Sequence, residues 1–171
     1  MEEWDIYNKD LEKTGKICVR GQYKLKENEY HLVVHVWILT KDGRILLTQR
    51  SKDKETNPLK WEGPGGSVVK GEKPVEGAKR EVFEEIGLDI PKEKFNLFRQ
   101  ERREKDFNDF FFAYYVIVEE SIINEIKFLD NEAVDKKWVT IEKFNKMFDD
   151  GEIIKTLSYF KDEYYNILKS I

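Results

Sequence analysis

"GSVVKGEKPVEGAKREVFEEIGL", residues 66–88, predicts a glycine-containing loop followed by a helix. Pro74 suits the first turn of that helix, and Gly87 suits the position just past its end. Apolar side chains recur at the helical period of about 100° per residue and form one stripe: Val75, Ala78, Val82 and Ile86. Three glutamates lie beside this stripe, at the rim where the helix would meet a sheet: Glu81, Glu84 and Glu85.

Like charges four residues apart cost an isolated helix roughly 0.2–0.5 kcal/mol per pair, so either solvent or a cation must offset the repulsion between the glutamates. Carboxylates without cysteine partners suit a hard cation such as Mg²⁺ or Mn²⁺. Gly65 and Gly66 would let backbone groups approach such a metal or a phosphate closely. A solvated acidic face is nevertheless the commoner explanation for glutamates on a helix. The choice between a metal site and a solvated acidic face therefore depends on the spacing of residues in the whole segment.

The segment resembles the Nudix family because it matches every specified position of the Nudix box, G-x5-E-x7-R-E-U-x-E-E-x-G-U, where U is a bulky aliphatic residue. The matching residues are Gly66, Glu72, Arg80, Glu81, Val82, Glu84, Glu85, Gly87 and Leu88. The resemblance extends over about residues 29–150. It implies a mixed sheet between helices, with a central catalytic helix. The predicted fold class is therefore α+β, an α/β/α sandwich.

The resemblance also implies an activity. Nudix hydrolases cleave a nucleoside diphosphate linked to another moiety X, with Mg²⁺ or Mn²⁺ and an attacking water. The implied catalytic residues are Glu81, Glu84, Glu85 and Arg80, and the implied metal ligands are Gly66, through its carbonyl, and the three glutamates. Which glutamate acts as the base differs within the family. Arg80 and Glu72 would orient the helix, and Arg80 can pair with Glu84 at i+4.

The candidate substrate-binding residues are Arg50, Trp61, Gly65 and Gly66. Arg50 could reach a phosphate, although a surface ion pair is equally compatible with its position. Trp61 and Tyr114 could stack on a base, but core packing is the better prediction for both. We expect Arg99, Arg102 and Arg103 to be solvated, because acidic residues alternate with them. Glu132 is a further candidate for a loop over the site.

The segment 31–51 and the loop after it also resemble isopentenyl-diphosphate isomerases of the Nudix superfamily, in which a histidine at the place of His31 ligates a metal. The catalytic cysteine expected after Trp61 is missing, and Cys18 lies far upstream. Isomerase chemistry on a prenyl diphosphate stays an alternative, as does a non-catalytic nucleotide sensor. For His31 and His35 a buried structural role is the better prediction, because both lie among apolar strand residues.

Composition limits the partners. The chain has 171 residues, a formal net charge of −4 and one cysteine, which disfavours a nucleic-acid polymer and excludes an intramolecular disulfide. The first residues have no basic and apolar leader pattern, and no apolar run is long enough to span a bilayer. We expect a cytoplasmic enzyme acting on a small diphosphate, without membrane contact, as a monomer or homodimer.

The pattern predicts one Nudix domain over residues 1–171, with a β extension at 1–30 and a C-terminal helix at 149–171. Two short strands are expected to meet at a turn near Glu27 and Asn28, and a hairpin is expected at 32–47 around Lys41-Asp42-Gly43. Further strands are predicted at 95–104, 109–120 and 135–141, and helical spacing at 141–151 and 153–171. The last of these segments would either close the core or form a dimer contact.

Overall fold

The structure is a computed structural model that describes residues 2–105, 107–129 and 131–171. A two-stranded hairpin precedes a mixed sheet of seven strands in this part of the chain. The strands are β1 (Glu3–Tyr7), β2 (Lys13–Val19), β3 (His31–Thr40), β4 (Ile45–Arg50), β5 (Trp61–Glu62), β6 (Gly65–Ser67), β7 (Asn96–Arg103), β8 (Asp109–Val118) and β9 (Ala133–Val139). The helices are α1 (Pro74–Ile86), α2 (Ile141–Asp149) and α3 (Tyr159–Ser170), with short 3₁₀ helices at Lys92–Lys94, Glu120–Asn124 and Lys155–Leu157.

The sheet runs β5-β4-β3-β8-β7, with β6 added to β3 and β9 added to β4. β3 and β8 pair in parallel along their whole length, from His31 opposite Asp109 to Thr40 opposite Val118. β6 pairs antiparallel with β3, which sets Gly66 opposite Val34 and Gly65 opposite His35. The loop that enters the acidic helix is therefore fixed to the central strand of the sheet.

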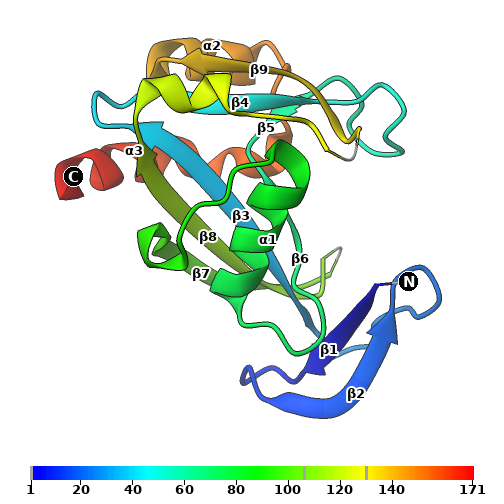
Figure 1. The fold of residues 1–171 in the computed structure, drawn as a ribbon. Coiled ribbons are helices and arrows are strands. Elements are labelled where there is room, and N and C mark those ends of the chain that lie inside the picture. Colours follow the sequence, from blue (N-terminus) through cyan, green and yellow to red (C-terminus); the bar gives the residue numbers. More distant parts are fainter. Residues whose placement is uncertain (1, 106, 130) are drawn as a thin grey trace.

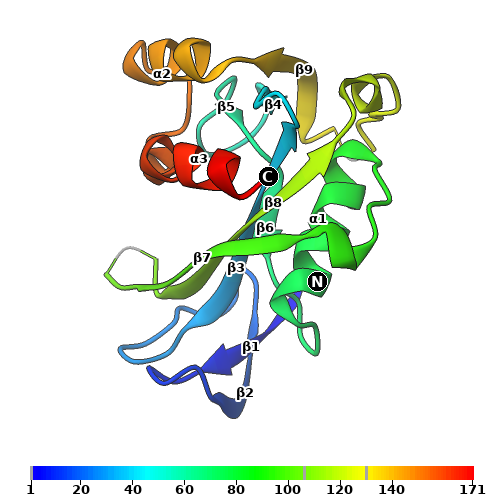
Figure 2. The same cartoon turned by 90° about the vertical axis from the view of Figure 1, so that its left-hand side faces the viewer.

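The helices cover opposite faces of this sheet (Figures 1 and 2). α1 packs on one face, where Val82 and Ile86 join Val34 and Val36 in one apolar core. α2 and α3 pack on the other face, where Phe144 and Phe160 join Trp37 in a second core. β3 supplies both cores because successive side chains of a strand point to opposite faces. The predicted α/β/α sandwich with a mixed sheet is confirmed.

The ends of α1 follow from the sequence. Pro74 begins the helix, and the backbone N–H of Lys73 donates to the Glu76 carboxylate at 2.8 Å. Gly87 ends it with φ of 70°, a left-handed conformation that a residue without Cβ adopts at little cost. A Cβ on Gly87 would also lie 3.0 Å from the carbonyl oxygen of Lys127. Local signals thus set both boundaries of the helix that carries the glutamates.

The hairpin β3–β4 and the antiparallel pair β7–β8 are confirmed, although Asp106 of the predicted turn lies outside the described residues. The strand pair expected around Glu27 and Asn28 is wrong. The first strands pair instead as β1 with β2, and residues 20–29 form turns and irregular chain. The third predicted strand is β9, which begins and ends two residues earlier than expected because Thr140 caps α2 by accepting a hydrogen bond from the N–H of Lys143.

The C-terminal helix also begins later than predicted. α3 starts at Tyr159, and residues 152–154 instead pair with Trp61. The N–H of Trp61 donates to the carbonyl of Glu152 at 2.9 Å, and the N–H of Ile154 donates to the carbonyl of Trp61 at 3.3 Å. The apolar face of α3 closes the second core, with Phe160 fully buried and stacked on Trp37 at a centroid distance of 3.7 Å.

No helix in the described ranges has the length and apolar character that crossing a bilayer requires.

Candidate active site

A polar pocket of about 280 Å³ opens where β6 meets α1. Its walls combine acidic and basic side chains with the backbone of residues 65–67. The acidic residues are Glu2, Glu81, Glu84, Glu85 and Glu132. The basic residues are Arg20, Arg50, Lys54 and Arg80. The pocket thus brings together all three glutamates, both glycines and two of the arginines that the sequence predicted for the site.

Arg80 holds the acidic side chains together. Its guanidinium donates to Glu72 at 2.9 Å and to both Glu81 and Glu84 at 2.8 Å. It also donates to the carbonyl oxygen of Ser67 at 2.8 Å, which ties α1 to β6. These ion pairs outweigh partial burial of the guanidinium and raise its pKa. The predicted i+4 pair with Glu84 is present, and Arg80 and Glu72 have the geometry expected of groups that orient the helix.

Glu81 lies against the backbone of Gly66. A Cβ on Gly66 would come within 2.6 Å of the Glu81 carboxylate carbon, so any other residue at this position would displace the carboxylate. Burial raises the pKa of Glu81 to about 7, although the nearby Arg80 acts in the opposite direction. A buried carboxylate of this kind can accept a proton near neutral pH.

Glu85 is the most buried of the three glutamates, with 8% of its surface exposed. Its Oε1 accepts a hydrogen bond from the N–H of Gly65 at 3.1 Å. Burial, followed by repulsion from Glu62 and Glu81, raises its pKa well above the ordinary value for a glutamate. The site therefore groups carboxyl groups whose ionisation burial disfavours, and a bound cation would stabilise their charged forms.

The donor set fits a hard divalent cation, because it consists of carboxylates beside a close backbone approach at Gly66. In the part of the chain that the structure describes, however, no three acidic, histidine or cysteine side chains converge tightly enough to form a ready metal site. Arg80 holds Glu81 and Glu84, and Gly65 holds Glu85. Each of these contacts involves one of the two oxygens of its carboxylate.

Of the other two predicted substrate-binding residues, Arg50 lines the acidic pocket and Trp61 lies outside it. Arg50 lines the pocket and pairs with Glu62 at 2.6 Å, and its guanidinium also donates to the carbonyl of Thr56. Trp61 does not line the pocket. It is buried in the second core, in agreement with the preferred prediction of core packing, and the Lys137 ammonium lies 3.7 Å from its ring centroid. Tyr114 is a core residue, as expected.

Sequence reasoning missed four residues of the pocket, Glu2, Arg20, Lys54 and Ser67, and had only a loose indication for a fifth. Glu2, Arg20 and Lys54 come from segments far from the Nudix box, and no motif marks them. Glu132, suggested only by its loop position, pairs with Lys54 at 2.5 Å. Their convergence depends on how the N-terminal hairpin and the loops after β4 and before β9 pack, which is long-range information.

The histidines and the cysteine lie in structural positions. The His31 ring stacks on Trp4 at a centroid distance of 4.4 Å, and burial lowers its pKa. His35 is buried with its Nδ1 3.1 Å from the hydroxyl of Tyr159, and burial lowers its pKa to about 3. Cys18 is fully buried in the N-terminal hairpin. Neither histidine nor Cys18 lines the acidic pocket.

A smaller hollow of about 180 Å³ adjoins the acidic pocket through Gly65 and Gly66. Arg103 lies in its wall between Phe107 and Phe111, with its guanidinium carbon 4.4 and 4.2 Å from their ring centroids. It also forms two hydrogen bonds to Asp109, at 2.8 and 2.7 Å. The expectation that Arg103 is solvated is therefore wrong, because two aromatic rings and a buried carboxylate hold it.

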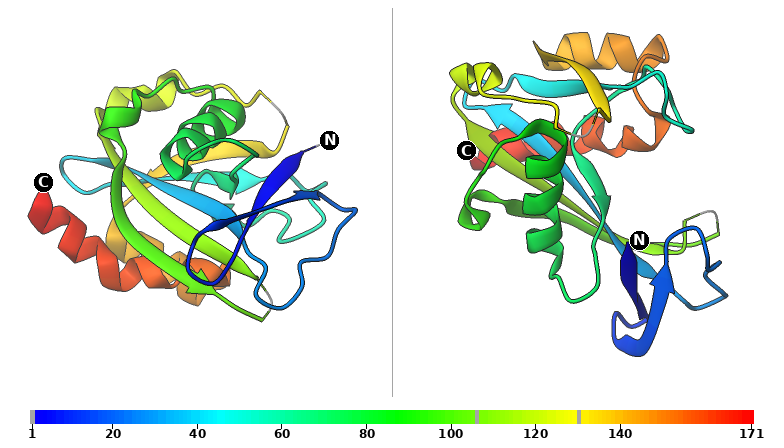
Figure 3. Two further views of the ribbon diagram at one scale, coloured as in Figure 1. Left: turned by 90° about the horizontal axis from the view of Figure 1, so that it is seen from below. Right: turned by 45° about the vertical axis from the view of Figure 1, so that its right-hand side comes forward.

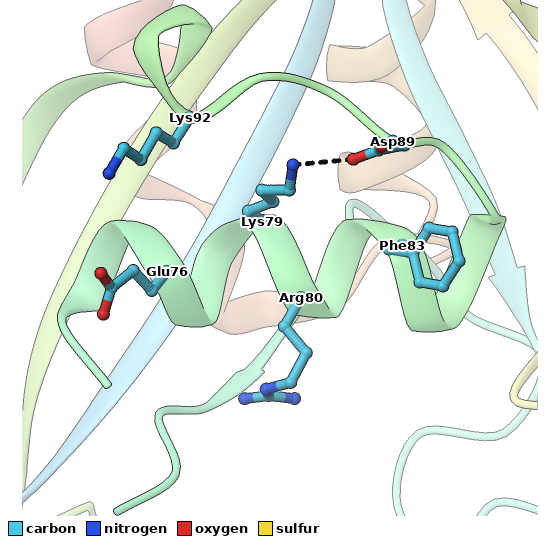
Figure 4. Close-up of a pocket in the computed structure, with 6 residues that line it drawn as sticks. All are labelled: Glu76, Lys79, Arg80, Phe83, Asp89 and Lys92. Atoms are coloured by element: carbon cyan, nitrogen blue, oxygen red, sulfur yellow. Dashed lines mark ion pairs between the residues drawn. The ribbon is translucent and has the colours of Figure 1, made fainter. Parts of the chain in front are cut away.

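Another hollow lies on the outer side of α1, near Phe83 and the ion pair between Lys79 and Asp89 (Figure 4). Figure 4 shows that the Arg80 side chain points away from Lys79 and Asp89. Glu76 lies on this outer side, and it is not among the residues of the acidic pocket. The two sides of α1 thus carry different groups, and the box glutamates belong to the side of the acidic pocket.

The fold and the pocket define an α/β/α protein with a carboxylate-rich site on a loop–helix motif. Residues 29–157 match the model of the NUDIX domain family, so the chain belongs to the Nudix family and acts on diphosphate bonds. A Nudix hydrolase of Listeria monocytogenes, described as uncharacterised, is 34% identical over 168 residues, which cover 98% of this chain and 95% of the relative. The match includes the N-terminal hairpin, which lies outside the family's matched region.

Solved structures agree with this assignment. DR0079 from Deinococcus radiodurans aligns with a TM-score of 0.71 and 21% identity, covering 96% of this chain and 98% of that protein. The MutT protein of Methanosarcina mazei aligns with a TM-score of 0.61 and 27% identity, covering 82% of this chain and 94% of that protein. The first likeness supports the fold alone, and the second supports a MutT-like hydrolase.

Proposed function

We propose that this chain cleaves the diphosphate linkage of a nucleoside diphosphate joined to another moiety X, with Mg²⁺ or Mn²⁺ and an attacking water. One observation carries the proposal: the three box glutamates share a pocket with Arg20, Arg50 and Lys54. Carboxylates suit a divalent cation, and the cationic side chains suit phosphate oxygens. A site with both is suited to a metal-bound diphosphate.

Glu81, Glu84 and Glu85 would hold the metal, together with the backbone carbonyl of Gly66. A bound Mg²⁺ or Mn²⁺ would polarise the phosphoryl group and stabilise the negative charge that develops on it. The positive charge of Arg80 neutralises the glutamates of the pocket only in part, and a bound metal ion would neutralise the rest.

The chain's own residues would position the reaction. Water forms a bond to one phosphorus, the bridging P–O bond breaks, and the proton of the water passes to a carboxylate. Glu81 and Glu85 are the candidates for this base, because burial favours their protonated form. Arg80 and the N–H of Gly65 keep these carboxylates in place.

The test measures product release from a panel of nucleoside diphosphates and diphosphate conjugates, with Mg²⁺ or Mn²⁺, by chromatography. Glu84→Gln should lower kcat by about 100-fold or more, because the substitution removes a charged metal ligand at a half-exposed position. Glu76→Gln is the matched control on the same helix, since Glu76 lies on the outer side and a glutamine there can still accept the N–H of Lys73. We expect it to keep the wild-type kcat.

Wild-type turnover in Glu84→Gln would contradict the proposal. Tight nucleotide binding without turnover across the panel would favour the sensor alternative. Proton exchange at the allylic carbon of isopentenyl diphosphate would favour isomerase chemistry, for which the buried Cys18 offers no proton donor or acceptor in the pocket.

A further inference from the structure

The N-terminal hairpin β1–β2 reaches the wall of the acidic pocket. Figures 2 and 3 show the N-terminal end of β1 on the side of the sheet that α1 covers. Glu2, just before β1, and Arg20, just after β2, both line the pocket. The backbone N–H of Arg20 donates to the carbonyl of Glu2 at 3.0 Å, so the two ends of the hairpin are joined there.

Several contacts fix the hairpin against the rest of the molecule. Trp4 stacks on His31 of β3. The N–H of Lys70 donates to the carbonyl of Glu3 at 2.8 Å, and the N–H of Gly71 donates to Asp5 at 2.9 Å. Lys70 and Gly71 belong to the loop between β6 and α1. The hairpin is therefore attached to the same loop that leads into the catalytic helix, and its end has a defined place beside the pocket.

Among the basic residues of the pocket, Arg20 has the most exposed side chain and a guanidinium with most of its donors unused. Arg80 bridges Glu72, Glu81, Glu84 and a backbone carbonyl. Arg50 pairs with Glu62 and a backbone carbonyl, and Lys54 pairs with Glu132. Within the described residues the Arg20 guanidinium makes one contact, to Glu2 at 3.0 Å, and 66% of its side chain is exposed. A guanidinium has five N–H donors in a fork that matches phosphate oxygens.

We propose that Arg20 binds a phosphate oxygen of the diphosphate substrate, by exchanging the carboxylate of Glu2 for the phosphate. The exchange does not leave Glu2 without a partner, because its Oε1 also accepts a hydrogen bond from the indole N–H of Trp4 at 2.6 Å. The N-terminal hairpin thus completes a substrate site whose metal-binding part lies in residues 29–157. This inference rests on the proposed function, since it assumes that a diphosphate enters this pocket.

The test compares Arg20→Ala with wild-type protein in the binding of imidodiphosphate, a diphosphate mimic with a P–N–P bridge, in the presence of Mg²⁺ by calorimetry. Arg20→Ala should weaken the affinity about 10-fold, the range of a charge-assisted hydrogen bond at a partly exposed site. Arg20→Lys should recover part of this loss, because it keeps the charge but not the fork. With a hydrolysed compound from the panel, KM should rise about 10-fold in Arg20→Ala while kcat stays within about twofold.

Lys13→Ala is the matched control. Lys13 is an exposed basic residue of the same hairpin that pairs with Asp5 at 2.7 Å and lies outside the pocket. The Lys13→Ala variant should bind imidodiphosphate with the same affinity as the wild type. Equal affinity of wild type and Arg20→Ala, an equal loss in Lys13→Ala, or no binding by the wild type would overturn the role of Arg20. Absence of wild-type turnover with retained binding would contradict only the proposed hydrolysis.

Discussion

Glu29 shows how one buried carboxylate fixes the irregular segment between the N-terminal hairpin and β3. Its oxygens accept hydrogen bonds from the Lys16 ammonium at 2.8 Å, the Tyr23 hydroxyl at 2.7 Å and the Lys26 N–H at 3.1 Å. Burial favours the protonated form, but the hydrogen bonds outweigh it and lower the pKa of Glu29 to about 2. Because the pKa is lower in the folded state, ionised Glu29 stabilises the fold.

Glu29→Gln should lower the free energy of unfolding by about 1–3 kcal/mol at pH 7. The contribution of Glu29 is fully present above its ordinary pKa of 4.5 and is lost as the pH falls toward 2, so wild type and variant should converge over that range. Denaturant titrations at several pH values measure this difference. Glu93→Gln, in an exposed position, should leave stability unchanged. A constant difference between Glu29→Gln and wild type at every pH would contradict the assignment.

At the scale of elements, the end of α1 depends on Gly87. Gly87→Ala would place a Cβ in a left-handed conformation and 3.0 Å from the carbonyl oxygen of Lys127. Gly151 has φ of 74° with no atom within 4 Å of its Cβ position, so Gly151→Ala tests the conformational cost alone. We expect the free energy of unfolding to fall by about 1 kcal/mol in Gly151→Ala and by about 2 kcal/mol in Gly87→Ala, as measured by thermal unfolding. Equal losses would show that the Lys127 contact costs nothing.

Elements with local signals were predictable from the sequence, and elements fixed by distant partners were not. Pro74 and Gly87 mark α1 within its own segment. The pairing of β1 with β2 instead depends on burial of Ile6 and Cys18 and on the contact of Trp4 with His31. Residues 152–154 have helical spacing, but their backbone groups pair with β5, and this non-local pairing prevails over the local preference.

The site divides in the same way. The box residues were predictable because the chemistry requires them at fixed spacing on one loop and one helix. Arg20 and Lys54 reach the pocket only through the packing of segments far apart in the chain, and their sequence surroundings carry no motif. For Trp61 the sequence left stacking on a base and core packing open, with core packing preferred, and its side chain packs in the second core. An aromatic residue near the box in sequence was therefore not enough to define a substrate contact.

At the scale of the whole molecule, the sheet separates two apolar cores, and the acidic pocket opens at the edge of one of them. The cores must supply enough stability to keep Glu81 and Glu85 poorly solvated and close to further carboxylates. Such groups destabilise a fold unless a cation or a proton neutralises them. Function and stability are thus opposed at this site, which is common in active sites.

This opposition predicts the response of the whole molecule to metal. At 100-fold excess over its Kd, Mg²⁺ should raise the free energy of unfolding of the wild type by about 2.7 kcal/mol relative to protein in chelator. Glu85→Gln removes a carboxyl group whose ionisation burial and the charge of Glu62 disfavour, while its amide oxygen can still accept the N–H of Gly65. In chelator the variant should therefore be more stable than the wild type, by about 1–3 kcal/mol, but it should gain little from Mg²⁺ and lose activity. Thermal unfolding with and without Mg²⁺ measures both effects.

A wild type that Mg²⁺ does not stabilise would show that these glutamates are not the metal ligands. A Glu85→Gln variant that gains as much stability from Mg²⁺ as the wild type would show the same.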